Sequence, residues 1–388
     1  MSHKKEKLSL NVTLKKGATL HAGEGVKLKQ IASERLTFQG DPLSPLLAPR
    51  GICYDGKHLI VTDTGQNRIF IWHALPNQIM QEPDLVLGQQ DAVVTGRNAG
   101  GNVSQGTLHY PSGIWSDGHH LVVADAWNHR VLVWHSFPTS NGQPADVVIG
   151  QPDFLSNAPN VHGIGKPPQA NTLNWPYGVF VHDGQLFIAD TGNRRVLVYN
   201  TIPTSNFAKA DHVIGKSGFD DRDYSHEDAI WPYAVKVSKS GQMAITDTQY
   251  YRVLLWNNWK TALDRKADAI IGQPDFESNG QNQYGLFPDA HTLNWCYDCH
   301  FYKDGFLVAD TGNSRLLHFD TFPDHHNPKA DHLIGKPNFN TSSEFSDTVF
   351  GTEKSLYWPF SLSIDEDNKL LILADTGNHR ILFFDLLI

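Results

Sequence analysis

Short apolar runs separated by turn residues dominate this sequence, and no long stretch has a convincing helical period. Residues 186–189 and 196–199 are two such runs, each four residues long and followed by Asp190 or Asn200. Aliphatic and aromatic residues fill these runs, and Gly, Pro, Asn and Asp punctuate them, which is typical of strands and turns. The pattern therefore predicts an all-β protein.

The strands recur in a repeated unit. Variants of Asp-Thr-Gly-Asn occur six times at intervals of 57 to 65 residues, and an Arg stands five residues after each Asp. A segment related to Trp-Pro-Tyr-Gly-Val precedes each Asp, and segments of the Val-Val-Ile-Gly type follow the Arg. The six pairs are Asp63 and Arg68, Asp125 and Arg130, Asp190 and Arg195, Asp247 and Arg252, Asp310 and Arg315, and Asp375 and Arg380. Each unit thus supplies four strands, and four-stranded units repeated radially form a β-propeller.

The ends of the chain indicate how the ring closes. The sixth unit ends at Ile388 after only three strands, and residues 35–40 match its missing fourth strand. Closing a ring in this way protects strand edges. We therefore expect a six-bladed propeller of four-stranded antiparallel blades over residues 35–388, preceded by an N-terminal extension over residues 1–34. Residues 36–39 should pair with the strand at residues 381–384.

These motifs resemble the NHL-repeat family, whose units carry Pro-x-Gly-Val, Ala-Asp-Thr-Gly-Asn and Arg-Val patterns. The resemblance covers roughly residues 35–388 and implies the same six-bladed fold. It implies function only broadly, because NHL propellers include protein-binding and RNA-binding modules and enzymes such as peptide-amidating lyases. The metal-binding histidines of those lyases cannot be placed residue by residue on this chain.

Composition and charge disfavour several classes of function. Apolar residues make up 40% and charged residues 19% of 388 residues, as in a globular protein. A net charge of −9 without a dense basic run beyond the N-terminus argues against nucleic-acid binding. No apolar stretch approaches a membrane span. Three cysteines and no signal peptide predict a cytoplasmic protein, unless a leader has been replaced. We expect a small-molecule ligand or a protein partner.

The repeated Asp and Arg residues are predicted to be structural. An Asp that opens a Thr-Gly-Asn turn can accept hydrogen bonds from the turn, and the Arg can brace its neighbour. A feature present in every blade serves what all blades share. Function is expected where one blade departs from the others.

The position after the strand-opening Pro is one place to look for such departures. It reads Arg50, Ser112, Tyr177, Tyr233, Tyr297 and Phe360, and Trp127 adds an aromatic from a turn on the same face. These side chains should gather at one mouth of the central channel. They predict either packing between blades or an aromatic pocket for a small organic or cationic ligand.

The position four residues after the Pro reads Cys53, Trp115, Phe180, Lys236, His300 and Ser363. Because the blades that carry them are contiguous in a closed ring, the four polar residues should form an arc along the channel. Buried polar groups need hydrogen-bond partners or water. The arc is therefore either a water-lined wall or part of a site.

The fifth unit departs most from the others, with Cys296-Tyr297-Asp298-Cys299-His300. Strand alternation predicts Cys296, Asp298 and His300 on one side, with Cys299 as a buried thiol. A bulge could instead turn both sulfurs inward. The string also matches haem attachment, an interpretation disfavoured by its predicted place on a strand and by the missing export signal.

Two chemistries fit these residues. Cys296, Cys299 and His300 could hold a zinc or copper ion. A thiol nucleophile with a His base and an orienting Asp is equally compatible, with Cys53, Lys236, Asp298 and His300 as the catalytic candidates of a lyase or hydrolase. The alternative is a non-catalytic interaction scaffold that uses the long loops between blades.

Overall fold

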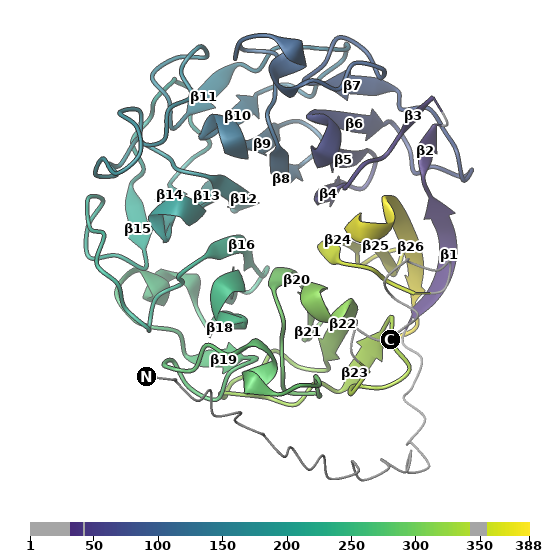
Figure 1. Cartoon of the computed structure of the whole chain (residues 1–388), viewed down its shortest axis with the longest axis vertical. Helices are drawn as coiled ribbons and strands as arrows, with labels where there is room; N and C mark the ends of the chain where they lie inside the picture. Colours follow the sequence, from purple (N-terminus) through teal and green to yellow (C-terminus); the bar gives the residue numbers. More distant parts are fainter. Residues whose placement is uncertain (1–31, 42, 342–354) are drawn as a thin grey trace, which may run out of the picture.

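The chain forms a six-bladed β-propeller in a computed structural model that describes residues 32–41, 43–341 and 355–388 (Figure 1). Six four-stranded antiparallel sheets surround a central axis, and the described residues contain short 3-10 turns but no α-helix. The predicted fold is confirmed. No helix in these described segments is long and apolar enough to cross a membrane.

Within each of the first five blades, the strands follow chain order from the channel outward. Blade 1 contains β4 (Gly51–Tyr54), β5 (Leu59–Asp63), β6 (Arg68–Trp72) and β7 (Leu85–Leu87), and blade 2 contains β8 (Pro111–Ser116), β9 (Leu121–Asp125), β10 (Arg130–Trp134) and β11 (Val147–Ile149). Blade 3 contains β12 (Pro176–His182), β13 (Gln185–Asp190), β14 (Arg195–Tyr199) and β15 (His212–Ile214), and blade 4 contains β16 (Pro232–Val237), β17 (Met243–Asp247), β18 (Arg252–Trp256) and β19 (Ala269–Ile271). Blade 5 contains β20 (Cys296–Tyr302), β21 (Gly305–Asp310), β22 (Arg315–Phe319) and β23 (His332–Ile334).

Blade 6 is assembled from both ends of the described chain. It combines β24 (Pro359–Asp365), β25 (Leu370–Asp375) and β26 (Arg380–Leu386) with the N-terminal β1 (Ala32–Phe38). In Figure 1 the purple β1 runs along the yellow β26. Leu36, Thr37 and Phe38 pair with Phe383, Leu382 and Ile381, respectively. The predicted closure is therefore confirmed, and a small hairpin of β2 (Gly40–Asp41) and β3 (Ser44–Pro45) follows it. Most of the predicted extension over residues 1–34 lies outside the described residues.

The repeated Asp and Arg residues form the same buried ion pair in every blade. Arg Nε lies between 2.6 and 2.9 Å from the Asp carboxylate in all six pairs. In blade 3, the second oxygen of Asp190 accepts the backbone N–H of Asn174, and Arg195 donates to loop carbonyls. Since a buried ion pair stabilises only when its remaining hydrogen bonds are satisfied, these contacts agree with the predicted structural role.

The threonine of the same turn joins neighbouring blades. Thr191 Oγ1 donates to the carbonyl of Pro232 at 2.5 Å, and Thr248 donates to that of Cys296 at 2.8 Å. Thr376 of blade 6 donates to the carbonyl of Pro49, which joins the last blade to the first. The apolar core lies between adjacent sheets, so each blade needs its neighbours to bury its faces.

Candidate functional site

The aromatic residues predicted at the channel mouth do come together where the inner strands begin. The Tyr177 and Tyr233 rings stack with centroids 4.8 Å apart, and the Tyr297 and Phe360 rings stack at 4.0 Å. Tyr233 also meets Tyr297 edge-on at 4.6 Å. The Arg50 guanidinium lies 4.2 Å from the Phe360 centroid, within cation–π range.

These side chains fill this end of the channel. The Tyr233 hydroxyl shares a 3.0 Å hydrogen bond with the Ser112 hydroxyl two blades away. Trp127 stacks on Tyr110 beside Tyr177. The remaining cavity is only about 30 Å³. The structure therefore shows aromatic packing here, and ligand binding by Arg50, Trp127 and the tyrosines stays a prediction.

A larger pocket lies where the same inner strands end. Its volume is about 300 Å³, at the lower limit of the usual range for small-molecule sites. Phe180, Lys236 and His300 come from β12, β16 and β20, while Tyr54 closes it from blade 1. Asp365 at the end of β24 and Glu366 and Asp367 in the following turn add an acidic rim. This pocket, which we call the channel pocket, collects two of the four polar residues of the predicted arc.

Asp298 fixes the lysine of the channel pocket. Its Oδ1 lies 3.4 Å from Lys236 Nζ and accepts the Cys299 backbone N–H at 2.9 Å. Its Oδ2 accepts the Ser361 hydroxyl at 3.0 Å and the Leu362 backbone N–H at 2.9 Å. Asp298 is 4% exposed, so its charge is stabilised by these four donors rather than by water. The carboxylate thereby links blades 4, 5 and 6.

His300 is held as a neutral imidazole. Its Nδ1 lies 2.6 Å from the Phe301 carbonyl, which can only accept, so Nδ1 carries the proton. Burial, together with the nearby Lys236 charge, lowers the His300 pKa to about 4. At neutral pH, Nε2 is therefore an unprotonated acceptor for a hydrogen bond or a ligand for a metal.

Cys53 and Ser363, the other members of the arc, do not line the channel pocket. Ser363 accepts the Tyr54 backbone N–H through Oγ at 3.0 Å. The Cys53 thiol lies 3.8 Å from the Ser116 carbonyl, and burial raises its pKa to about 12. A thiol with that pKa is protonated at neutral pH and is a poor nucleophile. The channel pocket thus brings together Lys236 and His300 but does not include Cys53.

The side-chain alternation predicted for β20 is wrong at its first residues. The pairing of β20 with β21 shifts register between Cys296 and Asp298, which is a β-bulge. Cys296 and Cys299 consequently share one apolar cluster between blades 4 and 5, with Phe306 among its members. Asp298 instead contacts Lys236 and blade 6.

Both thiols on β20 are fully buried, and burial raises the pKa of each well above its ordinary value. The Cys296 thiol donates to the Arg252 carbonyl. Within the described residues, Cys296, Cys299 and His300 do not form a cluster of metal ligands. Their arrangement therefore gives no support to the predicted zinc or copper site.

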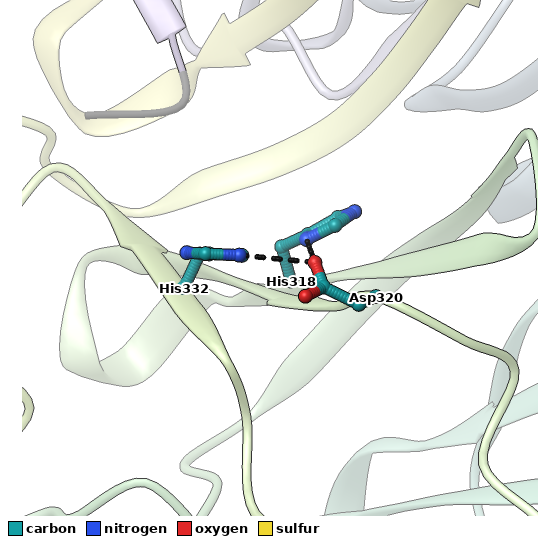
Figure 2. Close-up of side chains that lie close together, drawn as sticks. All are labelled: His318, Asp320 and His332. Atoms are coloured by element: carbon teal, nitrogen blue, oxygen red, sulfur yellow. Dashed lines mark ion pairs between the residues drawn. The ribbon is translucent and has the colours of Figure 1, made fainter. Parts of the chain in front are cut away.

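A different group of metal-ligand residues lies on the outer strands of blade 5 (Figure 2). His318 on β22 and His332 on β23 both point toward Asp320, and the three ligand atoms lie within 4.8 Å of one another. Sequence analysis missed this triad. A signal was present, because His318 stands three residues after Arg315, where the other blades have aliphatic residues or Phe. Those residues are Ile71, Val133, Val198, Leu255 and Phe383.

Comparison with models of known protein families gives no match for this chain, and comparison with curated protein sequences gives none either. The propeller fold rests on the structure, and the resemblance to NHL repeats rests on the motifs quoted above. A propeller hosts many unrelated functions, so the function has to be argued from the geometry of the sites.

Proposed function

We propose that this chain is an NHL-type propeller that binds a small organic acid in the channel pocket, with Lys236 and His300 as the groups that contact the ligand. The observation that carries the proposal is the fixed ammonium group at the pocket wall. Lys236 Nζ lies 3.4 Å from Asp298 Oδ1 and 5.6 Å from the centroid of the Phe180 ring.

The donors and acceptors favour an acid group on the ligand. An ammonium group has three N–H donors, and within the described chain Asp298 is the one acidic partner of Lys236. The Asp298 carboxylate already accepts from three other donors. The remaining Lys236 donors are thus available to a ligand carboxylate, and His300 Nε2 can accept an N–H or O–H.

The walls and rim narrow the ligand class further. Phe180 and Tyr54 supply apolar surface for the body of the ligand. Glu366 at the rim is neutralised by Lys239 at 2.8 Å, whereas Asp367 is exposed and forms no ion pair with the described residues. An acidic rim attracts an ammonium group. An aromatic amino acid, with its carboxylate at Lys236 and its amine at the rim, combines these features best.

Binding is favoured over catalysis by the state of the reactive groups. Cys296 and Cys299 are buried, Cys53 is partly buried, and the pKa of each of the three thiols is raised by desolvation. With a pKa of about 4, His300 is a weak base for proton abstraction near neutral pH. A lyase or hydrolase reaction therefore has no activated nucleophile among the predicted residues.

A set of three probes with one common ring tests the ligand class. Phenylacetate is an anion, phenylalanine a zwitterion and phenethylamine a cation. Ligand-observed NMR with the full chain should detect phenylalanine and phenylacetate, and Lys236→Met should abolish both signals. Lys266→Met, which removes an exposed lysine paired with Glu227, is the matched control and should change neither. Binding of phenethylamine alone, or acid binding that survives Lys236→Met, would contradict the proposal.

An interaction scaffold is the second candidate, and exposed apolar residues on the loops between blades favour it. Ile164 is 95% exposed and Leu286 is 78% exposed. Exposed apolar side chains of this kind are found at protein interaction surfaces. Lys236→Met leaves these loops untouched, so loss of ligand binding in that variant separates the two functions.

A further inference from the structure

Two histidines face each other across neighbouring strands of blade 5. His318 on β22 and His332 on β23 are direct antiparallel partners, so their side chains project from the same face of the sheet. Their ring centroids are 5.6 Å apart. Asp320, just after β22, places Oδ1 3.0 Å from His332 Nε2 and 3.5 Å from His318 Nδ1. One carboxylate oxygen thus lies close to both imidazoles, as Figure 2 shows.

His318 is buried without a hydrogen bond at the nitrogen that faces Asp320. Its side chain is 4% exposed, and Nδ1 has no hydrogen-bond partner. Leaving a buried polar atom unsatisfied costs about 1–3 kcal/mol. The aliphatic residues at this position in blades 1 to 4 avoid that cost. A ligand that occupies the space between the imidazoles and Asp320 would remove it.

The local backbone accommodates this group of side chains. The Asp320 backbone N–H donates to Asp331 Oδ2 at 2.9 Å, as the equivalent residues do in blades 1 to 4, and this bond fixes the start of the loop between β22 and β23. A side chain at Gly305 would place its Cβ 2.9 Å from His318 Nε2, so the glycine leaves room for the imidazole. Asp320 is 60% exposed, which leaves a path to solvent.

We propose that His318, Asp320 and His332 bind a divalent transition-metal ion, with His318 Nδ1, His332 Nε2 and an Asp320 oxygen as ligands. Neutral imidazoles and a carboxylate are a set that suits Zn²⁺ and Fe²⁺. Three protein ligands leave a coordination position open to water or to an exogenous molecule. The site lies on the outer strands of blade 5 and is independent of the channel pocket on the inner strands.

Metal binding is tested with the untagged full chain after treatment with a chelator. Equilibrium dialysis against Zn²⁺ alone, followed by elemental analysis, should find one tightly bound ion per chain, and Mg²⁺ should not compete. Co²⁺ should give visible absorption bands that Zn²⁺ abolishes. His332→Ala and Asp320→Asn should each weaken Zn²⁺ binding at least about 10-fold. His212→Ala changes the residue at the same position of blade 3 and should leave binding unchanged.

His318→Val keeps the test independent of misfolding. This variant restores the type of residue found in blades 2 and 3 and removes the unsatisfied nitrogen. It should melt at the same temperature as the metal-free wild type or higher, while losing the rise in melting temperature that Zn²⁺ gives the wild type. The proposal is overturned if the wild type retains no Zn²⁺, or if Zn²⁺ binding and its thermal stabilisation persist in His318→Val.

Discussion

Lys236 Nζ on β16 lies 3.4 Å from Asp298 Oδ1 on β20, and this ion pair joins two neighbouring inner strands at the channel. Asp298 is saturated by donors from blades 4, 5 and 6, whereas Lys236 has donors left for a ligand. The acid therefore has a structural role and the base a binding role. This division of roles is the basis of the proposed function.

Asp298→Asn should lower stability. The variant keeps the shape of the side chain but removes the charge that holds Lys236 and strengthens three hydrogen bonds. We expect a loss of about 1–3 kcal/mol in the free energy of unfolding. Chemical denaturation measures it, with Asp304→Asn at an exposed turn of the same blade as the control. Equal stability of the two variants would show that the Asp298 contacts do not matter.

Acid should destabilise the protein partly through His300. Its folded pKa is about 4, below the unfolded value of about 6.5, so the unfolded state binds more protons between these pH values. Stability from this group is therefore present above pH 6.5 and is lost as pH falls towards 4, by up to about 2 kcal/mol at pH 5. His300→Gln should lose less stability than the wild type between pH 7 and pH 5. If the wild type and His300→Gln lose the same stability between pH 7 and pH 5, the neutral state of His300 in the folded protein is contradicted.

The three thiols should be inert in the folded protein. Burial raises the pKa of Cys53 to about 12 and those of Cys296 and Cys299 well above the ordinary value. Iodoacetamide should therefore leave all three unmodified near neutral pH and alkylate all three in denaturant, as mass spectrometry can show. Rapid alkylation of one thiol in the folded protein would contradict this expectation and support the predicted cysteine nucleophile.

Ring closure should depend on Phe38. This side chain of β1 is fully buried against Ile381 of the adjacent strand β26 and Trp72 of blade 1. Phe38→Ala should lower the free energy of unfolding by about 3–5 kcal/mol. Arg35→Ala, on the same strand, removes only an exposed ion pair with Asp385 and should cost less than about 1 kcal/mol. Similar melting of both variants would mean that β1 does not fasten the ring.

The repeat made the fold predictable from the sequence, because the same strand and turn signals occur six times and one strand is missing from the last unit. The candidate site was harder to predict from the sequence. The bulge after Cys296 cancels the alternation on which the cysteine prediction depended, and blades 2, 3, 4 and 6 have a register shift at the equivalent position. It placed Cys299 beside Cys296 in the core and left Asp298 facing Lys236.

The blade 5 triad was missed for a different reason. His318 and His332 are separated by a loop, so only the register of β22 against β23 makes them neighbours. On the inner strands, the differences among the blades identify Lys236 and His300. On the third strand of each blade, the same comparison identifies His318, since no other blade has a histidine at this position.

The most direct test of the channel pocket is to locate a bound acid. Crystals of the full chain soaked with 4-bromophenylacetate should show an anomalous bromine signal in the channel pocket. The carboxylate should lie within hydrogen-bond distance of Lys236 Nζ, and the ring beside Phe180. A bromine position at the opposite end of the channel, beside Arg50 and Tyr233, or no bound acid in crystals whose pocket is open to solvent, would contradict the proposed function.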